Sequence, residues 1–236
     1  MTGDSKKIQK PASISEVDAF LRQVRATPAP AAGRRGRLIF AMDATASREP
    51  TWDRAAQIQA DMFRETADMG GLEIQLCYYR GILQFESSAW CRDADVLRKC
   101  MSRVFCAAGL TQIGRVLQHA LEEARDSKVN ALVFVGDCVE ENEDELSGLA
   151  GRLGLLGLPA FVFQEGRDPA AERSFRQIAR LSGGAYCHFD ASSPQTLRDL
   201  LSAVAVYAAG GRAELENFAN MRGGEVLRLT HQIIKK

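Results

Sequence analysis

The chain has 236 residues, 46% of them hydrophobic, and its 30 basic and 30 acidic side chains leave it with no formal net charge. This length and composition suit one domain with a sizeable core. The balanced charge favours neither a nucleic-acid partner nor a membrane surface, and no apolar stretch approaches the ~20 residues of a membrane span. Because residues 1–7 lack the apolar core of a signal peptide, we expect a cytoplasmic protein without nucleic-acid or membrane partners.

The six cysteines fit a reducing compartment. They are unevenly spaced and form no C-x-x-C pair, which disfavours both a disulfide framework and a zinc site. Cys77 and Cys187 lie in apolar, strand-like runs and are predicted to be small core residues. Cys138 directly follows Asp137, which is a candidate metal-binding residue discussed with the motifs that follow. Oxidation of Cys138 could therefore disturb that site, but we expect Cys138 to be an inert thiol.

Residues 1–36 are predicted to form an N-terminal extension. Ser13 and Glu16 make a capping-box pattern, which opens an amphipathic helix over residues 14–25. This helix could pack back onto the domain or dock a partner, and packing is favoured on general grounds. A linker rich in Pro, Ala and Gly follows at residues 27–33.

From residue 37 to 209, strand-like and helix-like segments alternate, which is typical of a parallel α/β sheet. Apolar or alternating runs predict strands at 37–43, 72–79, 131–136, 158–163 and 185–189. Arg80-Gly81 predicts a tight turn into a short antiparallel strand, Ile82 to Phe85. Helical spacing predicts helices at 51–69, 93–105, 113–125, 168–181 and 194–209. Gly210-Gly211 then breaks the pattern, and residues 210–236 are predicted to be a C-terminal extension.

The first predicted strand ends in an aspartate, and two hydroxyls follow at alternate positions, as Asp43-x-Thr45-x-Ser47. Because the backbone curls just past a strand end, oxygen side chains spaced by two can converge on one point. A carboxylate together with neutral hydroxyls suits a hard divalent cation such as Mg²⁺. The alternative is that Asp43 and Ser47 cap the helix that starts near Pro50, and this short string alone favours neither.

Two later stretches favour the metal. A loop places Thr111 just before a helix, and the apolar run from Ala131 to Gly136 predicts a strand that is followed by Asp137. Asp-x-Thr-x-Ser, then a threonine, then an aspartate after a buried strand resembles the metal-ion-dependent adhesion site (MIDAS) of von Willebrand factor A (VWA) domains. The acidic run from Glu140 to Glu145 is expected to be a solvated helix start at the rim of this site.

The resemblance implies a doubly wound, Rossmann-like α/β fold. Its six-stranded sheet would be mostly parallel, with one short antiparallel edge strand and helices on both faces. The resemblance also implies Mg²⁺, with Mn²⁺ or Ca²⁺ as alternatives, at the carboxyl ends of the first and fourth strands. Thr45, Ser47 and Thr111 would bind the cation through their hydroxyls, and Asp43 and Asp137 directly or through water. The family more often has serine in place of Thr45, but threonine keeps the hydroxyl.

Several enzyme classes are disfavoured because their motifs are missing. No G-x-G-x-x-G follows the first strand, and neither a Walker loop nor G-x-S-x-G occurs. The remaining enzymatic alternative is phosphotransfer of the haloacid-dehalogenase type, which also uses an aspartate after the first strand. Such enzymes have Asp-x-Asp there, and Thr45 takes the place of their second aspartate.

The resemblance therefore implies a non-enzymatic protein-binding module. In such a module the open position on the cation takes an Asp or Glu side chain of a partner. By family analogy, intracellular members serve in multiprotein assemblies, often with AAA-type ATPases. The alternative in a third class is a metal-free scaffold of the same fold that binds through its terminal extensions.

Overall fold

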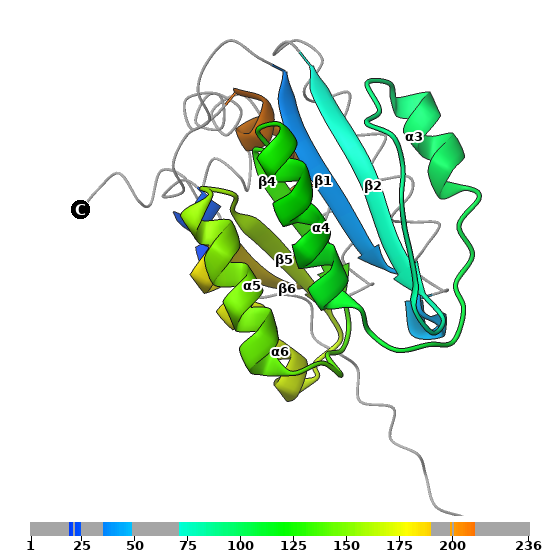
Figure 1. Cartoon of the computed structure of the whole chain (residues 1–236), viewed down its shortest axis with the longest axis vertical. Helices are drawn as coiled ribbons and strands as arrows, with labels where there is room; N and C mark the ends of the chain where they lie inside the picture. Colours follow the sequence, from blue (N-terminus) through cyan, green and yellow to red (C-terminus); the bar gives the residue numbers. More distant parts are fainter. Residues whose placement is uncertain are drawn as a thin grey trace, which may run out of the picture.

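The computed structural model describes residues 19–20, 22–24, 35–48, 71–189, 199 and 201–210, and it confirms the predicted fold class (Figure 1). Six strands form one sheet in the order β3-β2-β1-β4-β5-β6. The β2–β3 pair is antiparallel, and every other neighbouring pair is parallel. The predicted helix at 51–69 lies outside the described residues, as do residues 1–18 and 211–236.

The strands are β1 (Gly36–Asp43), β2 (Leu72–Arg80), β3 (Gln84–Ser87), β4 (Ala131–Gly136), β5 (Ala160–Glu165) and β6 (Ala185–Phe189). The helices are α3 (Ala94–Met101), α4 (Ile113–Asp126), α5 (Glu143–Leu155) and α6 (Pro169–Ser182), and a 3₁₀ turn η1 spans Ala46–Arg48. Residues 201–210 are also helical. None of the described helices is both long enough and apolar enough to cross a membrane.

Alternate side chains of the parallel strands enter two separate cores, one on each face of the sheet. In β1, Ile39 and Ala41 pack with α4, α5 and α6, which lie in front of the sheet in Figure 1. Phe40 and Met42 pack on the opposite face, together with α3 and residues 201–208. Continuous apolar strands are therefore required, because water reaches neither face.

The described part of the N-terminal helix packs onto the sheet. Phe20 is fully buried, and its ring lies 6.2 Å from that of Phe161 and 5.1 Å from that of Phe163, both in β5. Val24, one turn later, is also fully buried. The division of the chain at residues 36 and 209 stays a prediction.

Two predicted boundaries were wrong near the β2–β3 hairpin. The antiparallel strand begins at Gln84 rather than Ile82, because Gly81 and Leu83 have φ angles of +58° and +67° and form a turn. Helix α3 ends at Met101 rather than Phe105. The Arg80 guanidinium binds the Phe105 carbonyl oxygen at 3.1 Å, which holds that residue in the following loop.

The sheet order puts a topological switch point between β1 and β4. The chain passes from β1 to β2 on one side, and β4 then pairs with the other side of β1. In open parallel sheets of this kind, ligands bind beyond the carboxyl ends of the strands at the switch point. Asp43 ends β1 and Asp137 directly follows β4, so the fold brings these two carboxylates to that place.

Candidate metal centre

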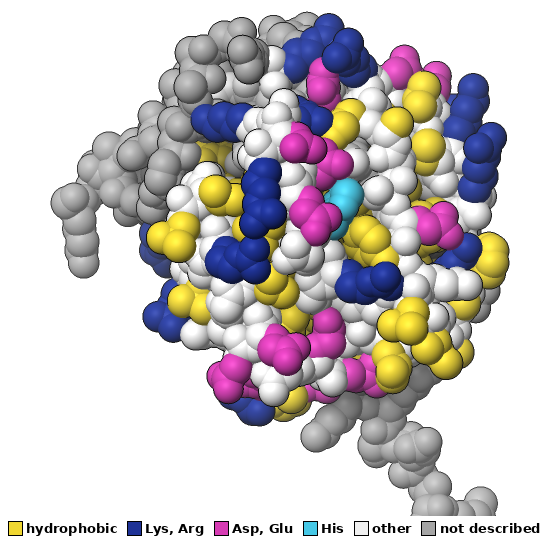
Figure 2. Space-filling view, viewed as in Figure 1, with side chains coloured by type: hydrophobic (Ala, Val, Ile, Leu, Met, Phe, Trp, Pro, Cys, Tyr) yellow, Lys and Arg dark blue, Asp and Glu magenta, His cyan; other side chains and the backbone are white. Residues whose placement is uncertain are grey.

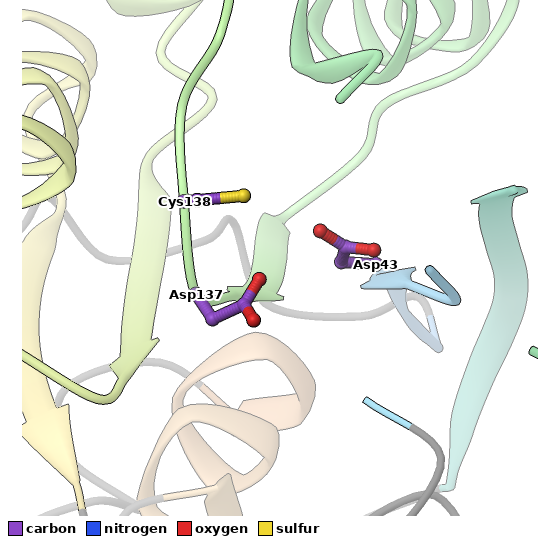
Figure 3. A group of neighbouring side chains, drawn as sticks. All are labelled: Asp43, Asp137 and Cys138. Atoms are coloured by element: carbon purple, nitrogen blue, oxygen red, sulfur yellow. The ribbon is translucent and has the colours of Figure 1, made fainter. Parts of the chain in front are cut away.

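Asp43 and Asp137 face each other at the carboxyl ends of β1 and β4. Figure 3 shows Asp43 at the tip of β1 and Asp137 on the segment after β4, where the neighbouring Cys138 side chain also points toward Asp43. One ligand atom from each of the three side chains lies within 4.8 Å of the others. Two acidic groups at such a distance repel each other unless a proton or a cation lies between them.

Asp43 is held in one orientation by two donors. Its carboxylate is fully buried; Oδ1 accepts a 2.7 Å hydrogen bond from the Thr45 amide, and Oδ2 accepts a 3.0 Å hydrogen bond from the Tyr79 hydroxyl. Burial raises the pKa of Asp43 above its ordinary 3.8, and the Asp137 charge adds to the rise, while the hydrogen bonds from Thr45 and Tyr79 oppose it. In the absence of a cation, ionisation of Asp43 is therefore less favourable than that of an exposed aspartate.

Asp137 has a buried oxygen without a partner among the described residues. Its Oδ1 atom is shielded from solvent and makes no hydrogen bond with the described residues. A buried carboxylate oxygen that is left unpaired costs free energy, and nearly all such atoms in folded proteins have a partner. Because a second carboxylate lies beside it, a cation between the two side chains would supply the missing partner. The oxygen donors of this place therefore fit a divalent metal ion.

The backbone curls at the Asp43-x-Thr45-x-Ser47 string. The hydroxyl oxygens of Thr45 and Ser47 lie 3.2 Å apart, and the amide of Thr45 turns back to Asp43. Thr45 is buried and Ser47 is exposed, so the string leads from the core to the surface. The capping alternative concerns a helix that starts near Pro50, which lies outside the described residues.

Thr111 reaches the same end of the sheet through Glu140, which follows Asp137 by three residues. The Thr111 hydroxyl oxygen accepts a hydrogen bond from the Glu140 amide at 3.0 Å, and the Thr111 amide donates to Glu140 Oε2 at 2.9 Å. This reciprocal pair fixes the buried Thr111 side chain next to the segment that carries Asp137. The loop that carries Thr111 and the segment that carries Asp137 are therefore joined by hydrogen bonds.

The first two residues of the acidic run, Glu140 and Glu141, precede α5 and are not part of the expected helix start, although Glu140 is exposed. Besides the Glu140 contact, the Glu141 carboxylate accepts hydrogen bonds from the amides of Ile113 and Gly114 at 2.8 and 2.7 Å. It thus caps the first turn of α4, whose own N-cap residue makes no side-chain cap. Helix α5 begins only afterwards, with Asn142 as its N-cap.

Sequence reasoning missed three supporting residues, namely Tyr79, Glu140 and Glu141. Tyr79 could have been found from the register alone, because it is the cross-strand partner of Asp43 once β1 and β2 pair in parallel. The two glutamates gave no such signal, since their partners lie 27 to 29 residues away in the chain.

The thiol of Cys138 is a poor ligand as it stands. Burial, followed by the negative charges of Asp137 and Asp43, raises its pKa to about 12. The group is therefore a neutral thiol near pH 7, and only the thiolate is a strong metal ligand.

No protein-family model matches the sequence, and no curated protein is significantly similar to it. Solved structures do match. The SpRpn10 VWA domain superposes with a TM-score of 0.56 at 16% identity over 71% of this chain and 94% of that domain. The chain has the VWA fold. A proximal thread matrix protein 1 from the mussel byssus, described as having a zinc-occupied MIDAS motif, matches with a TM-score of 0.56 at 13% identity.

VWA folds of this kind also occur inside longer proteins. The PilB minor pilin from Streptococcus sanguinis matches with a TM-score of 0.57 at 10% identity over 79% of this chain. The chain spans 63% of that pilin and 46% of the mussel protein. At these identities the matches establish the fold, and the metal centre must be argued from the residues of this chain.

Proposed function

We propose that the chain is a non-enzymatic protein-binding module of the VWA type. Asp43, Thr45, Ser47, Thr111 and Asp137 hold a divalent cation that engages an Asp or Glu side chain of a partner protein. The proposal rests on one observation above all, the buried Asp137 oxygen that has no partner in the described part of the chain and lies beside the Asp43 carboxylate.

The residues of the chain have distinct roles in this proposal. Asp43 and Asp137 supply the negative charge, and the three hydroxyls add neutral oxygens. When bound, the cation offers a coordination position to a carboxylate oxygen of the partner. Tyr79 and Thr45 orient Asp43, and Glu140 orients Thr111. An oxygen set of this kind favours Mg²⁺, with Mn²⁺ and Ca²⁺ as alternatives.

The partner is proposed to belong to a multiprotein assembly in the cytoplasm. Several VWA-fold neighbours are, by their descriptions, parts of larger structures, among them a minor pilin, a pilus adhesin and a COPII-coat protein. An AAA-type ATPase assembly remains a family analogy. None of the six cysteines, all of which lie in the described part of the chain, forms a disulfide, which supports a reducing compartment.

The phosphotransfer alternative finds little support at the site. Thr45 supplies a hydroxyl where that chemistry uses a second carboxylic acid, and Asp43 is engaged by two hydrogen bonds. We expect no hydrolysis of p-nitrophenyl phosphate by the chain with Mg²⁺. Hydrolysis that is abolished by Asp43→Asn would contradict the proposal and support the enzyme.

Water-proton relaxation with Mn²⁺ tests the proposed mode of binding. Mn²⁺ held by the protein should enhance the relaxation of water, and the amide of N-acetylaspartate should reduce this enhancement as its carboxylate replaces bound water. The amide of N-acetylasparagine is the matched control, because it lacks the charge. Equal effects of the two compounds would contradict carboxylate recognition, and no enhancement at all would contradict the metal centre.

A further inference from the structure

Four large apolar side chains are exposed near the candidate metal centre. Ile82 and Leu83 lie in the β2–β3 turn, and Phe105 and Leu110 lie in the loop between α3 and α4. Their exposed fractions are 76%, 74%, 64% and 56%, respectively. Isolated apolar residues are normal on a protein surface, whereas a cluster marks an interaction site. These four residues are called the hairpin patch below.

The turn and the loop form one continuous surface. The Leu110 amide donates a 3.3 Å hydrogen bond to the Gly81 carbonyl oxygen. Gly109 approaches Gly81 so closely that a Cβ atom there would lie 2.0 Å from the same oxygen. The Arg80 guanidinium stacks over the Phe105 ring, 3.8 Å from its centroid. In Figure 2 hydrophobic side chains gather at the lower right of the molecule, over this turn and loop.

Neither burial nor backbone preference explains why position 83 is a leucine. Its φ angle of +67° lies in the left-handed region, which glycine and asparagine adopt far more readily than leucine. Arg115 holds this conformation by donating a 2.8 Å hydrogen bond to the Leu83 carbonyl oxygen. A strained and exposed leucine that contributes nothing to the core points to a binding role.

The charges beside the hairpin patch indicate on which side of it a negatively charged partner segment would lie. Arg115 is exposed, and in the described part of the chain its guanidinium contacts Gln112 and the Leu83 carbonyl but no carboxylate. Acidic side chains lie instead at the start of α5, where Glu143, Asp144 and Glu145 are exposed. An acidic segment is therefore repelled from the α5 side and attracted to the Arg115 side.

We infer that the hairpin patch and Arg115 form the second half of the docking surface, and that they receive large apolar side chains flanking the acidic residue of the partner. This inference rests on the proposed function, because it assigns the acidic residue to the metal centre. Leu110 directly precedes Thr111, so one chain segment carries residues of both halves. The recognised segment would thus combine an acidic residue with neighbouring large apolar ones.

The inference is tested with a patch variant that leaves all proposed metal ligands intact. It combines Ile82→Ser, Leu83→Asn and Leu110→Ser, and it should fold normally because these side chains are exposed and asparagine suits the backbone at position 83. The matched control is Leu155→Ser with Leu156→Ser. These leucines are also exposed (89% and 51%), but they lie at the C-terminus of α5, away from the carboxyl ends of the strands. Thermal unfolding checks that both variants are folded.

The probe is a displayed library of random dodecapeptides, selected against the full chain in Mg²⁺ and, separately, in EDTA. With Mg²⁺, wild type and the leucine control should select peptides in which Asp or Glu lies close to Leu, Ile, Phe or Trp. The patch variant should keep the preference for the acidic residue and lose that for the apolar neighbours. The best peptide should bind the patch variant about tenfold more weakly.

The outcomes separate this inference from the proposed function. Peptides that are acidic but show no apolar preference on wild type, or an apolar preference unchanged in the patch variant, would overturn the inference and leave the metal centre standing. Apolar peptides selected equally in Mg²⁺ and EDTA, without an acidic preference, would overturn the proposed function and its link to the patch. Self-association of wild type that the patch variant abolishes would assign the patch to a second copy and overturn the inference.

Discussion

At the scale of single residues, the candidate centre depends on how Asp43 is held. Tyr79 is fully buried, and its hydroxyl is the donor to Asp43 Oδ2. Its ring stacks near Phe134, with centroids 6.3 Å apart, so the hydroxyl has little freedom to move. A metal-ligating carboxylate usually depends on such an orienting donor.

Tyr79→Phe should therefore weaken the centre without disturbing the core. The change removes one hydrogen bond to a charged group and keeps the ring, so the free energy of unfolding should fall by about 1 to 2 kcal/mol. The affinity for Mn²⁺ should fall about tenfold or more. Urea denaturation and a Mn²⁺ titration measure the two effects.

Tyr78→Phe is the control for this experiment, because the Tyr78 hydroxyl bonds the exposed Glu86 at 2.6 Å and lies on the neighbouring residue of the same strand. It should leave Mn²⁺ binding unchanged. Equal Mn²⁺ affinities of the Tyr79 and Tyr78 variants would show that Tyr79 does not orient a metal ligand.

The raised pKa of Asp43 predicts how stability depends on pH in EDTA. The folded protein holds the Asp43 proton more tightly than the unfolded chain does, so the free energy of unfolding falls as the pH rises from 3.8 through the raised pKa. Above that pKa the loss is complete. Asp43→Asn removes the charge and keeps the shape of the side chain. It should therefore be more stable than wild type at pH 7, and the difference should shrink as the pH falls toward 3.8.

Urea denaturation across this pH range measures the difference. Asp95→Asn, on the exposed face of α3, controls for the general effect of removing one negative charge. If wild type were more stable than Asp43→Asn at pH 7 in EDTA, the charged Asp43 would not destabilise the metal-free protein.

At the scale of elements, helix α4 is capped from outside its own sequence. Gln112 precedes the helix without a side-chain cap, and Glu141 supplies acceptors to the amides of Ile113 and Gly114. A carboxylate at this position also complements the positive end of the helix dipole. The cap thus ties the loop that carries Thr111 to the segment after β4.

Glu141→Ala should cost about 1 to 2 kcal/mol of unfolding free energy, as the loss of a helix cap does. Because the cap also fixes the loop before α4, hydrogen exchange should become faster at the first turn of this helix. Glu143→Ala is the matched control, since Glu143 is exposed in the first turn of α5. If both variants lost equal stability and kept equal exchange at α4, Glu141 would have no capping role.

The helices and strands could be predicted from the sequence where local sequence patterns determine them. Apolar runs place β1 and β4, and Asp168 with Gly183 marks the two ends of α6. Ile82 and Leu83 were misassigned to a strand, because apolar residues in a left-handed turn give the same signal as a short strand. The cap from Glu141 was not predictable, since it depends on a contact between segments far apart in the chain.

More of the candidate centre could be predicted from the sequence than of the residues that orient it. Asp43 ends one buried strand and Asp137 directly follows another, so a parallel sheet necessarily brings them to the same edge. The curl of Thr45 toward Asp43 also follows from local backbone geometry. That Asp137 Oδ1 has no partner among the residues that the structure describes became visible only in the folded structure.

At the scale of the whole molecule, the two ends of the sheet differ in how completely their charges are paired. At the amino ends, Arg37 stacks over Trp90 and lies within 3.6 to 3.8 Å of Glu73 and Glu123, and Trp90 donates a hydrogen bond to Glu123. At the carboxyl ends, Asp43 and Asp137 face each other without a compensating cation side chain among the described residues. The ion pairs and the Arg37–Trp90 contact stabilise the amino ends, whereas we propose that the two carboxylates at the carboxyl ends bind a ligand.

Calorimetric titration of Mg²⁺ and Mn²⁺ into metal-stripped protein tests the central claim most directly. Wild type and the surface control Asp144→Ala should bind about one equivalent, as a single oxygen-ligand centre does. Asp43→Ala, with its fold checked by circular dichroism, should bind none. The absence of binding by wild type, or binding that survives in Asp43→Ala, would contradict a metal centre at the carboxyl ends of β1 and β4.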